Sequence, residues 1–188
     1  AAVEGKRAQK GEDNALSILS DGRQGAVDVR LYDSEAEDHP DSKVNTMVRS
    51  VLERYHSDSD EHAGQTQLIF SDIGVHPAKS SGFHLYGDII KKLVAGGIPR
   101  DQIADFGVLD GAPRLAAAEN LRSGVVRVGI GGTDKLGTGM NVQTHLGAIH
   151  HLDVPYKPAY IEQRNGRIDR YGQRHRPVGR NLLRDTVA

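Results

Sequence analysis

Hydrophobic and polar positions alternate with a helical period in two segments of this chain. Over 44–55, apolar residues recur at i, i+3, i+4 and i+7, and Asp41 or Ser42 can cap the helix that this spacing predicts. A second apolar face of this kind runs over about 85–95. The glycine pair at 96–97 is typical of a helix end.

Short apolar runs between these segments predict buried strands. We expect strands at 67–71, 103–109, 125–130, 147–152 and 178–187, and further helices at 113–122 and 158–170. Strands that alternate with helices predict an α/β domain with a mostly parallel sheet covered on both faces. Functional groups in such sheets gather beyond the carboxyl ends of the strands. The loops after Ser71 and Ile130 and the turn after Asp153 therefore form the expected functional zone.

The first thirty or so residues follow a different pattern, because glycine and charged residues are frequent there and apolar stretches are short. This composition favours an extension or linker over a core element. We therefore expect residues 1–40 to precede a folded domain over 41–188.

Composition narrows the class of protein. The 188 residues are 37% hydrophobic and 26% charged, which is typical of one globular domain. The chain has no cysteine, which excludes cysteine-ligated metals and fits a reducing cytoplasm. Its nine histidines follow no ligand pattern, so no metal site is predicted. The net charge of −1 argues against indiscriminate coating of nucleic acid, and no apolar run is long enough to span a membrane.

A glycine-rich loop from Gly131 to Gln143 follows the third predicted strand. Backbone N–H groups of such loops can surround a phosphate. This loop lacks the Gly-Lys-Ser/Thr triplet of a Walker A motif and the G-x-G-x-x-G of a dinucleotide site. A tight turn that needs positive φ at Gly137 and Gly139 remains an alternative interpretation.

The predicted helix from Pro158 contains a regular arginine pattern. Gln163, Arg167 and Arg170 stand at i, i+4 and i+7, which places them on one face of a helix. A guanidinium can donate a planar pair of hydrogen bonds to phosphate oxygens. The pattern indicates an anion-binding surface, and a solvated basic face is the alternative.

Three segments resemble motifs of superfamily 2 helicases, especially the Swi/Snf-type branch. The motif VI pattern Q-x-x-x-R-x-x-R-x-G-Q is similar to Gln163, Arg167, Arg170, Gly172 and Gln173. The run 137–141 resembles motif V, and 67–71 resembles motif IV. The resemblance as a whole covers about 43–187. The chain is also similar to helicase-like proteins of phages and mobile elements, which often accompany DNA methyltransferases.

The resemblance implies a RecA-like three-layer α/β/α domain that forms the second lobe of an ATP-dependent helicase or translocase. Arg167 and Arg170 would act as arginine fingers toward ATP, and Gln163 would position one of these groups or the nucleotide. ATP and Mg²⁺ would bind mainly to a first lobe, whose Walker motifs this chain lacks. The chain alone is therefore expected to be inactive.

The resemblance also implies roles for the loops. Gly137, Gly139 and Asn141 would link the nucleotide site to nucleic acid, and Ser71 and Thr133 would contact the phosphate backbone. The expected partners are DNA, the first lobe and a methyltransferase domain, with RNA left open. A non-catalytic module that docks nucleic acid or a partner is the alternative, and a small-molecule Rossmann domain is a weaker one.

Overall fold

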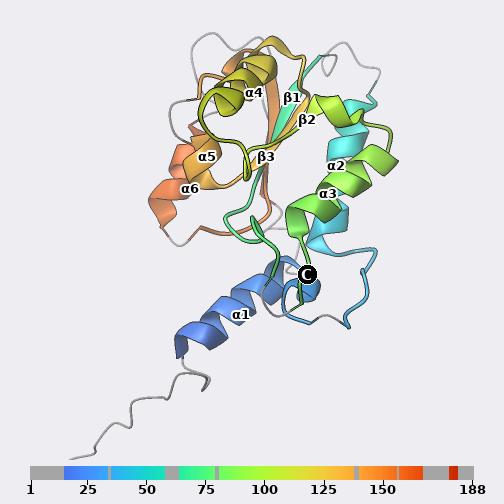
Figure 1. Cartoon of the computed structure of the whole chain (residues 1–188), viewed down its shortest axis with the longest axis vertical. Coiled ribbons are helices and arrows are strands. Elements are labelled where there is room, and N and C mark those ends of the chain that lie inside the picture. The colour runs from blue at the N-terminus through green and yellow to red at the C-terminus, as the bar shows by residue number, and fades with distance from the viewer. Residues whose placement is uncertain are drawn as a thin grey trace, which may run out of the picture.

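A parallel sheet forms the centre of the computed structural model, which describes residues 15–33, 35–57, 64–78, 81–137, 140–155, 157–166 and 178–181. The strand order is β2-β3-β1-β4-β5, and every pair of neighbours is parallel (Figure 1). The strands are β1 (Thr66–Phe70), β2 (Ile103–Asp105), β3 (Val128–Gly131), β4 (Leu146–His151) and β5 (Val178–Asn181). The predicted α/β class with a mostly parallel sheet is confirmed.

Helices cover both faces of this sheet and give three layers (Figure 1). One face is covered by α2 (Lys43–Tyr55) and α3 (Leu85–Ala95), and the other by α4 (Gly111–Ser123), α5 (Thr133–Gly137) and α6 (Pro158–Asn165). Among the described helices, none combines the length and apolarity needed to cross a membrane.

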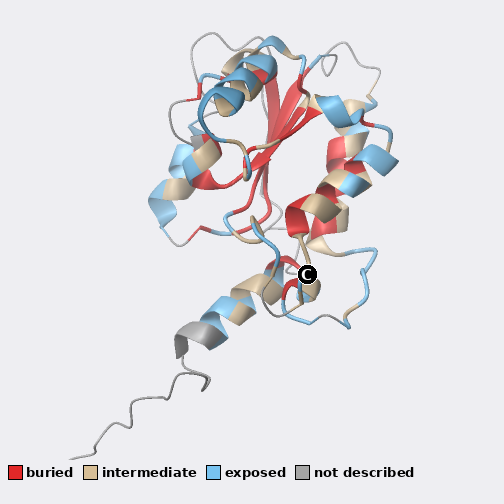
Figure 2. Cartoon of the chain, viewed as in Figure 1, coloured by how far each residue is buried: buried red, intermediate tan, exposed pale blue. Residues whose placement is uncertain are grey.

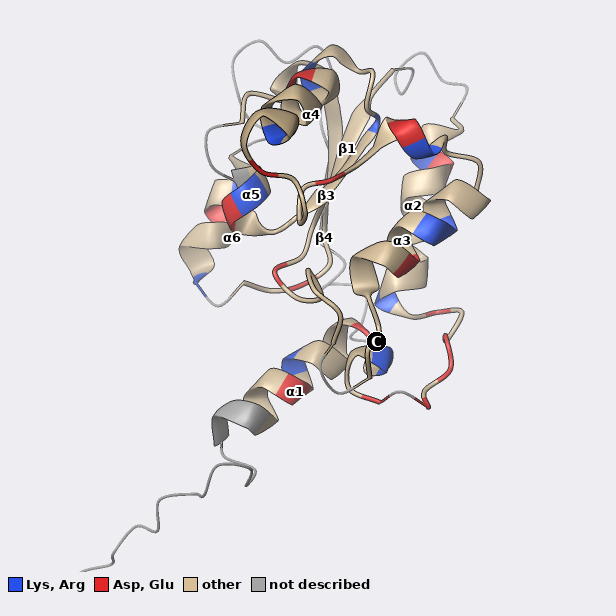
Figure 3. Ribbon diagram, viewed as in Figure 1, with Lys and Arg blue, Asp and Glu red and all other residues tan. Residues whose placement is uncertain are grey.

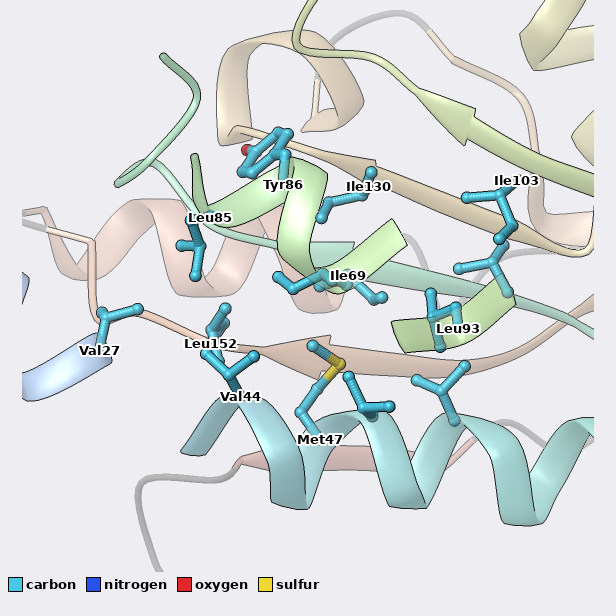
Figure 4. Packing of buried hydrophobic residues seen from close by; sticks show 14 of the residues in the cluster. Val27, Val44, Met47, Ile69, Leu85, Tyr86, Leu93, Ile103, Ile130 and Leu152 are labelled. Carbon is cyan, nitrogen blue, oxygen red and sulfur yellow. The ribbon is translucent and has the colours of Figure 1, made fainter. Parts of the chain in front are cut away.

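Two hydrophobic clusters lie on the two sides of the sheet, and buried residues follow the strands (Figure 2). In the first cluster, Val44 and Met47 of α2 lie close to Ile69 of β1 and to Leu152 (Figure 4). The neighbours of Ile69 in β1, Leu68 and Phe70, belong to the second cluster. This alternation follows from the two-residue period of a strand.

Glycines in β3 allow helices to pack closely on the second face. A Cβ atom at Gly129 would lie 2.9 Å from Leu121 Cδ1 of α4, and one at Gly131 would lie 2.9 Å from Leu136 Cγ of α5. Both distances are too short for a real contact. The sequence Val-Gly-Ile-Gly therefore places side chains on one face of β3 and leaves the other face open to neighbouring side chains.

The predicted helix boundaries of the first face are confirmed. Ser42 caps α2, because its hydroxyl accepts a hydrogen bond from the N–H of Asn45 at 3.2 Å. Gly96 is the C-cap of α3, and Gly97 has a φ of +97°, a conformation that favours glycine.

Other boundaries differ from the prediction. The expected strand at 103–109 ends at Asp105, whose Oδ1 accepts a hydrogen bond from the N–H of Gly107 at 2.9 Å and begins a turn. The expected loop at 131–143 contains α5, and its last residue, Gln143, begins a 3₁₀ turn (Gln143–His145). The expected helix at 158–170 is described as far as Asn165, and 167–170 lie outside the described residues.

The N-terminal segment contains α1 (Ala15–Val27) and a 3₁₀ turn, Val29–Leu31. The first part of α1 projects from the sheet domain (Figure 1). Val27 and Leu31, however, are 5% and 1% exposed and belong to the first hydrophobic cluster. Arg30 forms ion pairs with Asp28 and with Asp88 of α3 at 2.7 and 3.0 Å. The expectation that this segment is an extension without core residues is therefore wrong for Val27 and Leu31.

Candidate functional site

Three loops meet where β3, β1 and β4 end, at the carboxyl edge of the sheet. These strands are neighbours and end at Gly131, Phe70 and His151. The residues that follow include Thr133, Asp72 and Asp153, which come from the three segments expected to form the functional zone.

One buried arginine of α6, Arg164, contacts all three loops. Its Nε donates to Thr133 Oγ1 at 2.8 Å, and one terminal nitrogen donates to Asp72 Oδ2 at 2.7 Å. The other terminal nitrogen donates to Oδ1 and the carbonyl oxygen of Asp153, at 3.0 and 3.2 Å. Arg164 has no exposed surface, and its guanidinium lies over the Phe70 ring at 5.3 Å. We refer to Arg164, Asp72, Thr133 and Asp153 as the Arg164 cluster.

The loops of the Arg164 cluster are also hydrogen-bonded to one another. Asp72 accepts from the backbone N–H of Thr133 at 2.6 Å and from its hydroxyl at 2.8 Å. The N–H of Asp72 in turn donates to Asp153 Oδ2 at 2.9 Å. Gly132 allows this approach, since a Cβ there would lie 3.0 Å from Asp72 Oδ1. The four residues therefore form one continuous hydrogen-bonded network.

Two carboxylates share the single guanidinium in this cluster. The side chain of Asp153 is 1% exposed, whereas that of Asp72 is 31% exposed. Burial raises the pKa of the Asp153 carboxyl above its usual value, and the Arg164 guanidinium opposes that shift. Arg164 therefore favours the charged form of the Asp153 carboxyl.

Helix α3 contacts the same edge from the opposite face of the sheet. The Tyr86 hydroxyl donates a hydrogen bond to the carbonyl oxygen of Ser71. Burial raises the pKa of Tyr86, so its hydroxyl keeps the proton that it donates. This contact fixes the backbone where β1 leaves the sheet.

A cavity of about 590 Å³ opens beside the Arg164 cluster. Asp72 and Thr133 belong to its lining, together with Tyr160 of α6 and with charged residues of both signs: Arg23, Asp110, Asp134 and Lys135. Acidic and basic residues lie side by side on α5 (Figure 3). Lys135 forms an ion pair with Asp110 across the cavity lining. The carboxyl edge thus combines a rigid interior with an open, mixed-charge surface.

The residues predicted to act on ATP are only partly described. Gln163 lies exposed on α6, one residue before Arg164. Arg167 and Arg170 lie outside the described residues, so their common face stays a prediction. In the segment that resembles motif V, Gly137 ends α5 and Asn141 is exposed, whereas Gly139 lies outside the described residues.

The two residues predicted to contact nucleic acid have buried side chains. Ser71 is fully buried, and its hydroxyl donates to the carbonyl oxygen of Ile73 at 2.8 Å. Thr133 is 1% exposed and bonds within the Arg164 cluster. A phosphate contact from either hydroxyl would require these internal bonds to break. In this structure both residues fix the shape of their loops.

The histidine pair of β4 points to opposite faces of the sheet, as expected for a strand. His150 hydrogen-bonds Gln67 Oε1 at 2.9 Å, and Gln67 donates to a carbonyl oxygen of α2. His151 stacks on Phe70 and hydrogen-bonds Asn165 of α6 at 2.9 Å. His151 therefore adds a second contact between the sheet and the end of α6.

Sequence reasoning missed Arg164 and Asp72 as site residues. Each had a weak signal: Asp72 follows a buried strand, and Arg164 lies inside the segment that resembles motif VI. In the part of the chain that the structure describes, no cluster of histidine and acidic side chains could hold a metal ion.

Comparison of the chain with models of known protein families and with curated proteins gives no match. The functional interpretation therefore depends on the residues of the chain and on the site that they form.

Proposed function

We propose that this chain is the second, RecA-like motor lobe of a Swi/Snf-type superfamily 2 DNA helicase or translocase, within a longer protein. One observation carries the proposal. Arg164, inside the segment that resembles motif VI, contacts Asp72, which directly follows the motif IV-like strand, and Thr133, in the loop that leads to the motif V-like run. Three parts of the chain that are distant in sequence therefore converge at the carboxyl edge. This convergence supports the resemblance, because motifs that serve one site must meet in space.

In this proposal, α6 positions the arginines that act on the nucleotide. ATP, bound mainly on the first lobe, would supply the phosphoryl group that is transferred to water, and Mg²⁺ bound with it would neutralise part of the phosphate charge. Arg167 and Arg170 donate to the charge that develops on the γ-phosphate, an effect worth about 10³ to 10⁵ in rate in comparable systems. Gln163, exposed on α6, orients one of these groups or the nucleotide.

The loops at the carboxyl edge serve nucleic acid in the same proposal. Asn141 is exposed, and Lys135 lines the cavity beside the Arg164 cluster. Contacts of this kind reach the phosphate backbone without reading bases, which suits a protein that moves along DNA.

Substitution of the predicted fingers in the complete protein tests this function. Arg167→Ala and Arg170→Ala should each reduce kcat of DNA-stimulated ATP hydrolysis by at least about 10³-fold, with a smaller effect on ATP binding. Arg174→Ala and Arg176→Ala, also in the basic C-terminal run, are the matched controls and should retain most activity. If both finger variants hydrolyse ATP like the parent, the arginine pattern is a solvated basic face and the assignment of Arg167 and Arg170 is wrong. If the complete parent protein hydrolyses no ATP, the non-catalytic docking module becomes the better interpretation.

A further inference from the structure

Arg164 occupies a position that is costly for a charged side chain. It is completely buried, and its two ionic partners share a single positive charge. Removing a guanidinium from water carries a large desolvation penalty, and apolar residues of similar size often give equal or greater stability at such positions. Stability alone therefore explains Arg164 poorly.

The geometry of Arg164 instead favours a role in alignment. All three guanidinium nitrogens donate hydrogen bonds, and their acceptors belong to loops after three neighbouring strands. A planar guanidinium fixes both distance and direction for each acceptor. Any shift of Asp72 or Thr133 must therefore move Arg164 or break one of its bonds.

Arg164 also lies in the last turn of α6, three positions before the predicted finger Arg167 in the sequence. His151 holds the neighbouring Asn165 at 2.9 Å, so this turn is fixed to the sheet at two consecutive residues. The orientation of the last turn of α6 is therefore set by the Arg164 cluster and β4.

We propose that Arg164 is a positioning residue that makes ATP hydrolysis respond to bound nucleic acid. It transmits displacement of the loops after β1 and β3 to the segment that contains the predicted fingers. This inference rests on the proposed function and adds the regulation of the same site. Arg164 touches neither nucleotide nor nucleic acid, and it acts through the placement of α6.

The test compares three variants in the complete protein. Arg164→Met keeps a long side chain without charge, and Arg164→Lys keeps the charge without the planar group. Arg127→Met is the matched control, because Arg127 is half-buried just before β3, at the opposite edge of the sheet. Its Nε donates to the Gln65 carbonyl oxygen at 2.7 Å, and its guanidinium lies over the Tyr55 ring.

We expect both Arg164 variants to reduce kcat of DNA-stimulated ATP hydrolysis by about 10- to 100-fold, because misplacing a catalytic group by about 1 Å can cost as much as about 100-fold in rate. The KM for ATP should change less than about threefold, because ground-state binding is retained. Arg127→Met should keep the parent kcat. Arg164→Lys also keeps the test valid if Arg164→Met does not fold.

Hydrogen–deuterium exchange gives a readout that does not depend on activity. The backbone amides of Asp72 and Thr133 donate to carboxylates of the Arg164 cluster. We expect these two amides to exchange at least about tenfold faster in Arg164→Met than in the parent. The amides of α2 and α3 should keep the parent exchange rate. Unchanged exchange would overturn the proposed alignment. If Arg164→Met shows faster exchange but keeps the parent kcat, the positioning role is overturned. It is also overturned if Arg164→Lys keeps the parent kcat.

The finger variant Arg167→Ala separates the two proposals. If Arg167→Ala loses hydrolysis while Arg164→Met keeps it, the inference about Arg164 fails and the motor function stands. If the complete parent protein shows no DNA-stimulated hydrolysis, the motor function fails, and the inference fails with it.

Discussion

The Nε atom of Arg164 and the hydroxyl oxygen of Thr133 lie 2.8 Å apart and join the last turn of α6 to the first residue of α5. The same hydroxyl donates to Asp72 Oδ2 at 2.8 Å. Thr133 therefore uses its hydroxyl both as an acceptor and as a donor, which only a side chain of this type can do in so small a space.

Removal of this hydroxyl should destabilise the chain. Thr133→Val keeps the shape of the side chain but leaves the buried Nε of Arg164 without an acceptor, which should lower the free energy of unfolding by about 1 to 3 kcal/mol. Chemical denaturation measures this change.

Thr66 provides the matched control, because it is fully buried and its hydroxyl has no hydrogen-bond partner among the described residues. Thr66→Val should therefore change stability by less than about 0.5 kcal/mol or increase it. Equal losses in Thr133→Val and Thr66→Val would contradict a specific role for the Thr133 hydroxyl.

A second prediction concerns the N-terminal segment. Leu31 is 1% exposed in the first hydrophobic cluster, so Leu31→Ala should cost about 2 to 5 kcal/mol. Leu19, 56% exposed on the projecting part of α1, is the control, and Leu19→Ala should change stability by less than about 0.5 kcal/mol. Thermal melting distinguishes the two. Similar, small effects for both would show that this segment folds independently of the sheet domain.

The sequence predicts those helices and strands in which buried residues recur at one regular spacing. The boundaries of α2 and α3 are predicted well, because one face of each helix packs on the sheet and Ser42, Gly96 and Gly97 mark their ends. The predicted start of the third strand at Val125 is wrong, because Val125 is 61% exposed and β3 begins at Val128. A single apolar residue indicates hydrophobicity but not whether it is buried.

The Arg164 cluster could not be predicted in the same way. Arg164 lies 31 residues from Thr133 and 92 from Asp72 along the chain, and no periodicity relates these positions. In the sequence, Arg164 begins a basic run that is typical of a solvated surface. Only the parallel order of β3, β1 and β4 brings its partners together.

A third prediction concerns pH. Burial lowers the pKa of His151, so the folded chain resists protonation of this ring more than the unfolded chain does. As pH falls below about 6.5, the unfolded state binds the proton first, and stability falls by up to about 1.4 kcal/mol per pH unit.

His151→Phe retains a ring over Phe70 and should reduce this loss of stability between neutral and mildly acidic pH. His76→Phe, at an exposed position, is the control and should keep the slope of the parent. Denaturation midpoints measured across this pH range provide the test. An unchanged slope in His151→Phe would show that other groups determine the acid sensitivity.

The last prediction concerns binding of the chain itself to DNA. Its net charge is −1, and the cavity at the carboxyl edge contains residues of both signs, so few phosphates can be neutralised at once. We expect weak binding without sequence preference, whose affinity falls with salt at a log–log slope of about −0.9 per duplex phosphate contacted.

Lys135→Ala should make this slope shallower by about one contact, because Lys135 lines the cavity. Lys91→Ala, at an exposed position on α3 on the other side of the sheet, should leave the slope unchanged. Fluorescence anisotropy over a range of salt concentrations measures both slopes. A steep salt dependence for the parent, or a strong preference for one sequence, would argue against a motor lobe that contacts only the phosphate backbone. Equal slopes for the two lysine variants would show that the phosphate contact lies away from the cavity.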